Sequence, residues 1–163
     1  MIVTLLLDEA SLSFFDGQRK KYFPPALNFL SAHLTLFHHL PPGEPGIQAD
    51  LQQWSKESKQ VSLHVAEVKS IGKGVAYKID CPALLQLHKP MQQKWQAWLT
   101  PQDRQTLWPH VTVQNKVSPV VAKETLQSLQ ASFRPFTAQG LGFSLWHYQG
   151  GPWRHSQDFI FQQ

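Results

Sequence analysis

Two short segments of the chain carry the same pattern of residues that could transfer protons. The four residues from His33 (HLTL) and the four from His110 (HVTV) both read His-x-Thr-x among apolar residues. Residues i and i+2 of a strand share a face, so each segment predicts an imidazole and a hydroxyl about 6–7 Å apart on a polar face. Two such strands across a groove would surround a small anion. This predicts phosphodiester chemistry, because imidazoles exchange protons near neutral pH.

The elements that must position these residues follow from the hydrophobic pattern. The predicted order is strand, helix, strand, helix, hairpin, then helix, strand, helix, hairpin. Strands are expected at 2–7, 32–37, 61–68, 75–79 and 110–115, and a hairpin of two long strands is expected after residue 135. Helices are expected at 47–58, at 82–99 and over about 15 residues after Ser118-Pro119, with a shorter helical or irregular segment at 12–23.

The two successions of strand, helix and hairpin each include one His-x-Thr strand, which indicates an internal duplication. We therefore expect an α+β fold with two lobes, and a single two-lobed domain over residues 1–163. At 163 residues the chain is long enough to bury a substantial core.

Composition narrows the class of protein. The net charge of +4 slightly favours anionic partners such as RNA or nucleotides, although a basic solvated surface explains it equally well. Cys81 is the only cysteine, which excludes an internal disulfide and fits a reducing compartment. No apolar run approaches the length of a membrane span. We expect a cytoplasmic monomer that needs neither a membrane nor an obligate protein partner.

Other residues that could do chemistry have plainer explanations. His38 and His39 could join His33 and His110 in a zinc site, but neighbouring residues of a strand point to opposite faces, and we favour no metal. The cluster Arg19-Lys20-Lys21 could meet a phosphate backbone, but a solvated helix face is the favoured interpretation. The remaining histidines lack partner spacing and are expected to be structural or exposed; they are His64, His88, His147 and His155.

The paired motifs resemble the two-histidine (2H) phosphoesterase superfamily, in particular its bacterial members known as 2′-5′ RNA ligases or RNA 2′,3′-cyclic phosphodiesterases. His110 stands 77 positions after His33, and only the two tetrapeptides are specific. The resemblance implies a bilobal duplication of two antiparallel sheets, with helices packed outside and a central cleft that carries both His-x-Thr strands. The chain departs from the RNA ligase-like members after the first motif, where it reads FHHL at 37–40 rather than a Phe-Leu-Gly type continuation.

By this resemblance His33 and His110 are the catalytic acid and base, in either order, and Thr35 and Thr112 bind phosphate. Possible further substrate contacts are Arg154, whose guanidinium could grip a phosphate, Trp153, which could stack on a base, and Tyr77, near the predicted hairpin turn. No cofactor is expected.

The predicted activity is hydrolysis of a 2′,3′-cyclic phosphate at an RNA end or on a small nucleotide, with reverse 2′-5′ ligation as its counterpart. One alternative is a non-catalytic module that binds the phosphate of RNA or nucleotides. Another is a regulatory domain on a decayed enzyme scaffold, against which the intact His and Thr residues of both copies argue.

Overall fold

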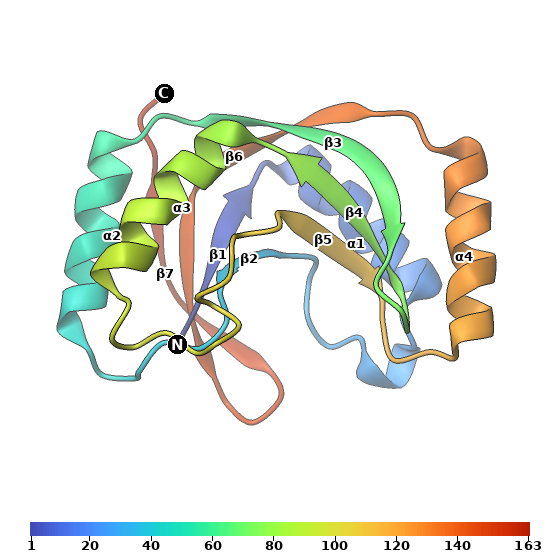
Figure 1. Cartoon of the computed structure of the whole chain (residues 1–163), viewed down its shortest axis with the longest axis horizontal. Coiled ribbons are helices and arrows are strands. Elements are labelled where there is room, and N and C mark those ends of the chain that lie inside the picture. The colour runs from blue at the N-terminus through green and yellow to red at the C-terminus, as the bar shows by residue number, and fades with distance from the viewer.

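The computed structural model describes all residues from 1 to 163 and shows a mixed α/β fold with four α-helices and one antiparallel sheet of seven strands (Figure 1). No helix is both long enough and apolar enough to cross a membrane. The helices are α1 (Glu9–Tyr22), α2 (Pro45–Glu57), α3 (Pro82–Lys94) and α4 (Pro119–Ser132), with a short 3₁₀ helix at Pro25–Leu27. The strands are β1 (Ile2–Leu7), β2 (Leu34–Phe37), β3 (Val61–Ser70), β4 (Val75–Asp80), β5 (His110–Gln114), β6 (Phe136–Tyr148) and β7 (Trp153–Ile160).

The strands form a single sheet in the order β2-β1-β6-β3-β4-β5, with β7 added to β6. The expectation of two separate sheets is therefore wrong. The reason is the length of β6, whose 13 residues serve both halves of the molecule. Residues 136–140 of β6 pair with β3, while residues 140–146 pair with β1 and residues 142–148 with β7.

The strand order places the two His-x-Thr strands at opposite ends of the sheet. β2 is one terminal strand and β5 is the other. The sheet curves strongly, so that Cα atoms of these two strands come within 8 Å of one another although the strands do not pair (Figure 1). The curvature of the sheet is thus what brings the two motifs together.

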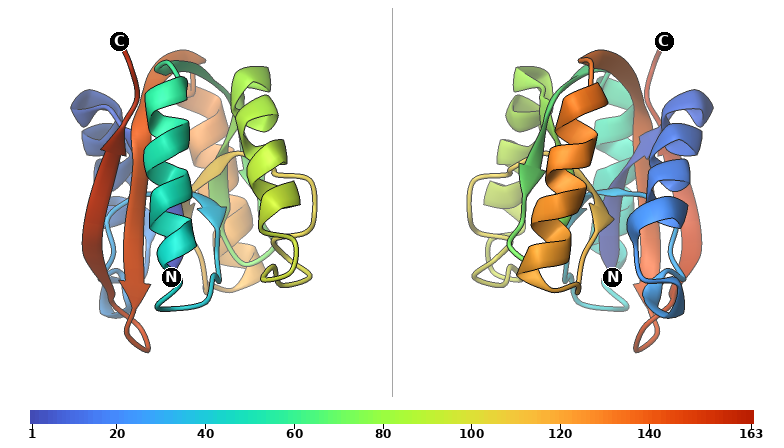
Figure 2. Two further views of the ribbon diagram at one scale, coloured as in Figure 1. Left: turned by 90° about the vertical axis from the view of Figure 1, so that its left-hand side faces the viewer. Right: turned by 90° about the vertical axis from the view of Figure 1, so that its right-hand side faces the viewer.

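The helices brace the two ends of this curved sheet. α2 and α3 lie at one end of the molecule and α4 at the other (Figures 1 and 2). α3 contacts β2 through His88. The ring of His88 stacks on Phe37, and its Nε2 forms a hydrogen bond with the Leu36 carbonyl at 3.0 Å. α1 packs along β5. One continuous cluster of 31 buried side chains forms the core, so the expected single domain has one interior.

Most predicted elements are present, with two local corrections. The helix expected at 82–99 ends at Lys94, because Trp95 leaves the helical path to bury its ring completely and donates from Nε1 to Asp50 at 2.9 Å. The segment expected to be short or irregular at 12–23 is the regular 14-residue helix α1, and the Asp8 side chain caps it by accepting from the Ser11 N–H at 2.9 Å.

Candidate active site

The two motif strands occupy equivalent places in the sheet. Thr35 is paired with Thr4 of β1, and Thr112 is paired with Ala76 of β4. In both pairs the register then slips at the same point, which leaves Leu36 and Val113 as bulged residues without a partner. The two His-x-Thr segments therefore have the same pairing pattern with their neighbouring strands.

The two imidazoles are held in the same way. Nδ1 of His33 is 2.7 Å from the carbonyl oxygen of Ser31, and Nδ1 of His110 is 2.7 Å from that of Trp108, in each case two residues earlier. A carbonyl only accepts, so both Nδ1 atoms carry the hydrogen. Nε2 of each ring makes no hydrogen bond within the protein, and it is therefore the nitrogen available to a ligand.

The environment makes both imidazoles weaker bases than a free histidine. Burial is the main reason that the pKa of His33 falls from 6.5 to about 4; the bond to the Ser31 carbonyl opposes the shift, and charge on Arg19, His38 and His110 adds to it. Burial also lowers the pKa of His110, with a smaller contribution from His38. Because charge on His110 affects His33, the two rings lie close enough to interact electrostatically.

This electrostatic arrangement predicts how stability varies with pH. Between about pH 4 and 6.5 the unfolded chain protonates His33 while the folded protein does not, so the free energy of unfolding must rise with pH across that window. The contribution of His33 is at most about 3 kcal/mol. Urea unfolding at several pH values should show a flatter profile for His33→Gln than for the wild type. Parallel profiles for the two proteins would contradict the lowered pKa.

Arg19 is a buried neighbour of the second motif strand. It is 4% exposed, and its Nη1 donates to the Thr112 carbonyl at 3.0 Å while its Nε donates to Asn28 at 3.1 Å. The solvated helix face is therefore wrong for Arg19. The spacing of Ser11, Phe15 and Arg19 at four-residue intervals on the buried side of α1 is the signal that could have found it.

Of the three further contacts expected, only Trp153 lies against a motif residue. Its ring packs on His33 with centroids 4.5 Å apart, as Trp108 stacks on His110 at 4.3 Å. Arg154 follows Trp153 but is exposed and pairs in register with His147. Tyr77 is 2% exposed and packs against Phe14, Phe15 and Phe133, so the structure places it in the core.

A third histidine, His38, stands beside the motif residues. The bulge at Leu36 buries both Leu36 and Phe37, and so turns His38 to the same side as Thr35. Without the bulge, regular strand alternation would have placed His39 rather than His38 on that side. No three His, Cys, Asp or Glu side chains converge as metal ligands would.

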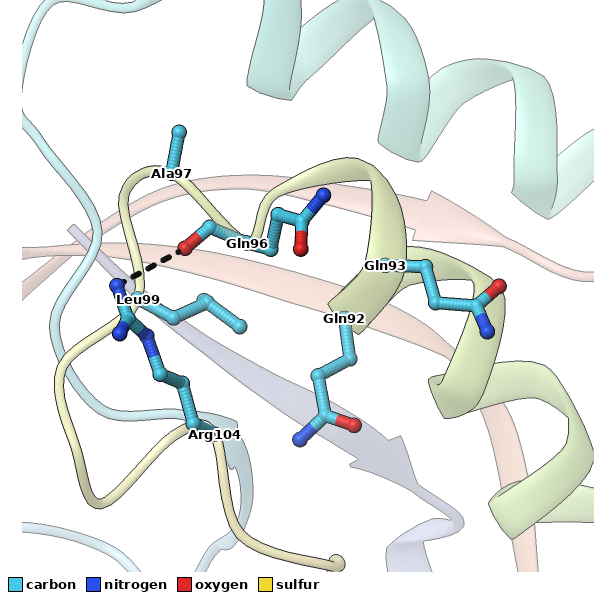
Figure 3. A pocket seen from close by; sticks show the side chains of 6 residues that line it. All are labelled: Gln92, Gln93, Gln96, Ala97, Leu99 and Arg104. Carbon is cyan, nitrogen blue, oxygen red and sulfur yellow. Dashed lines mark hydrogen bonds between the residues drawn. The ribbon is translucent and has the colours of Figure 1, made fainter.

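Of three cavities in the molecule, two border the motif residues. The largest, about 590 Å³, lies at the end of α3, where Arg104 donates to the Gln96 carbonyl at 3.3 Å; no motif residue lines it (Figure 3). A cavity of about 180 Å³ is bordered by Thr35, His38 and His110, and another of about 170 Å³ by His33, Trp146 and Asp158. Two small cavities therefore border the motif residues, one beside Thr35 and His110 and the other beside His33.

Comparison with known proteins gives the family. The model of the 2′-5′ RNA ligase superfamily matches residues 7–152 of the 163, a span that includes both His-x-Thr strands. A comparison with curated proteins found no match. The fold and site define a protein with two matched His-x-Thr strands on one curved antiparallel sheet. The chain belongs to the 2′-5′ RNA ligase superfamily of 2H phosphoesterases.

Proposed function

We propose that this protein is a phosphodiesterase that opens 2′,3′-cyclic phosphates of RNA ends or small nucleotides by paired-histidine acid–base catalysis. The observation that carries the proposal is the matched geometry of His33 and His110, each with Nδ1 fixed on a carbonyl and Nε2 free. Membership of a superfamily named for RNA ligation supports RNA as the substrate and phosphoester chemistry as the reaction. Reverse 2′-5′ ligation would use the same groups.

The matched registers also support the proposal that the chain is an internal duplication with two lobes and a shared cleft. The strand order is symmetric about the β6/β3 pair, so that β1 corresponds to β4 and β2 to β5. If the chain is divided into β1–β3 and β4–β6, the motif strand is the second strand of each part. A twofold arrangement suits displacement at phosphorus, because the entering and leaving oxygens lie on opposite sides of the phosphate. Each side then has one imidazole.

We assign the two roles from the difference in pKa shift between His33 and His110. His33 has the more strongly lowered pKa and is neutral at neutral pH, so we assign it as the base. His110 is the acid, because the less perturbed ring of a pair holds a proton more readily. Both protonation states keep the Nδ1–H bond to the backbone carbonyl, and neither imidazole has to rotate between them.

In the proposed reaction a water oxygen forms a bond to phosphorus while Nε2 of His33 takes the proton of that water. The bond from phosphorus to one ribose oxygen breaks, and Nε2–H of His110 gives its proton to that oxygen. The product is a nucleoside phosphate monoester. The hydroxyls of Thr35 and Thr112 donate to the non-bridging oxygens, where negative charge increases in the transition state. Two imidazoles supply both proton transfers, so the scheme uses no metal and no cofactor.

The test is product analysis with a chelator present. The purified protein is incubated with each nucleoside 2′,3′-cyclic monophosphate and with a short RNA that ends in a 2′,3′-cyclic phosphate. We expect a single monophosphate isomer from at least one of them. Tight binding without product, retained when both histidines are replaced, would instead establish the non-catalytic module. The cytoplasmic location and the monomeric state stay predictions.

A further inference from the structure

The imidazole of His38 is held by Asp103, which lies on the loop between α3 and β5. Its Nδ1 lies 2.8 Å from Oδ1 of Asp103, whose side chain is 1% exposed. The same carboxylate accepts the backbone N–H of His38 at 2.9 Å and that of His39 at 3.0 Å. Burial alone would raise the pKa of Asp103, but these hydrogen bonds lower it, so the carboxylate is charged. Nδ1 of His38 is therefore a donor, and Nε2 is the nitrogen left for a ligand; it donates to an anion when the ring is an imidazolium, with a hydrogen on both nitrogens.

The loop that carries Asp103 is itself fixed. Nε2 of Gln92, on α3, donates to the carbonyls of Asp103 and Gln105, both at 2.8 Å. The Asp103 N–H donates to Oγ1 of Thr100 at 3.3 Å. These bonds set the carboxylate, and through it the imidazole of His38, in one place before any ligand arrives.

The cavity beside His38 has the chemistry of an anion site. Its polar lining consists of imidazoles, hydroxyls and amides, and its only carboxylate is Asp103, whose oxygens are already engaged. His88 also lines it, but Nε2 of that ring is bonded to the Leu36 carbonyl. The lining includes Thr35 and His110 but neither His33 nor Thr112. The cavity therefore adjoins the proposed position of the reacting phosphate at Thr35 and His110 and extends from there to His38.

We propose that this cavity is a second phosphate subsite, in which His38 contacts a phosphoryl group other than the one that reacts. The inference rests on the proposed function and sharpens its substrate class. It favours an RNA end, where a further phosphodiester adjoins the cyclic phosphate, over an isolated cyclic mononucleotide. Asp103 is the positioning residue of this subsite, because it acts only through His38.

The kinetic test compares a nucleoside 2′,3′-cyclic monophosphate with a dinucleotide that ends in the same cyclic nucleotide. We expect the wild type to prefer the dinucleotide in kcat/KM by about tenfold or more, which is the scale of one charge-assisted hydrogen bond. His38→Gln should lower this preference about tenfold. His39→Gln is the matched control, since its exposed side chain lines no part of the cavity, and it should keep the wild-type preference. Equal losses of His38→Gln on both substrates, or none, would overturn the proposal.

A binding experiment separates failure of the subsite from failure of the proposed function. In calorimetry, pyrophosphate should bind the wild type about tenfold more tightly than inorganic phosphate, and His38→Gln should lose most of that difference. In nuclear magnetic resonance of the wild type, pyrophosphate should shift the ring signals of His38 and leave those of His64 in place. These results would support the subsite even if no cyclic phosphate were turned over. An unchanged His38 signal with pyrophosphate bound would refute it.

Discussion

Replacement of either motif histidine should abolish most activity on a cyclic phosphate. We expect kcat to fall by a factor of about 10² to 10⁴ in His33→Ala and by a similar factor in His110→Ala, because each variant lacks one of the two proton transfers. The two should differ in their response to pH. His33→Ala removes the group with the pKa of about 4, so the acid limb of the pH profile should disappear with it. His110→Ala should remove the alkaline limb.

The control for this experiment is His64→Ala, which removes an exposed histidine on β3 and should retain wild-type kcat. Steady-state kinetics with the cyclic mononucleotide as substrate and chelator in the buffer measure all three variants. Full activity in either motif variant would rule out the paired mechanism. Circular dichroism checks that each protein is folded, so that a loss reports on chemistry.

The second large effect concerns the two threonines. Thr35→Val and Thr112→Val keep the branched shape on the strand but remove the hydroxyl, and we expect kcat to fall by about 10-fold to 10³-fold in each. The losses should be of similar size, because each threonine holds the same register position and is followed directly by a bulged residue. The effect should fall on kcat more than on KM, since the hydroxyls act on charge that develops in the transition state.

Thr137→Val, at an exposed position of β6, is the matched control and should leave kinetics unchanged. A loss confined to one of the two motif threonines would show that the phosphate is held asymmetrically, contrary to the proposed reaction. A change in KM alone would assign the hydroxyls to ground-state binding.

The sequence was sufficient for the parts of the fold that depend on local pattern. Alternating residues around His33 and His110 identify the motif strands, and the order of elements follows from apolar periodicity and from Pro and Gly positions. The match to the superfamily confirms the resemblance. What the pattern could not supply is how β6 bridges both halves of one sheet, because pairing between strands far apart in sequence leaves no local trace.

The same limit explains the misplaced site residues. His38 and His39 were set aside as zinc ligands because neighbouring residues of a strand point to opposite faces. The alternation did not show which of the two shares a side with Thr35, and the bulge of one residue at Leu36 makes it His38. Tyr77 was a possible substrate contact because it is near the predicted hairpin turn, but its side chain is buried on β4 among the aromatic rings of α1. Arg19 looked solvated within a basic run, whereas its helix face determines its contacts. Each error arose where tertiary geometry overrides residue type.

The pairing of β6 with β1 also constrains the order in which the molecule can assemble. β1 is synthesised long before its partner on one side, residues 140–146 of β6. β3, in turn, receives β6 beside residues 61–65. Such long-range pairing closes large loops and slows folding. Until β6 has been synthesised, β1 has an unpaired apolar edge that is open to aggregation.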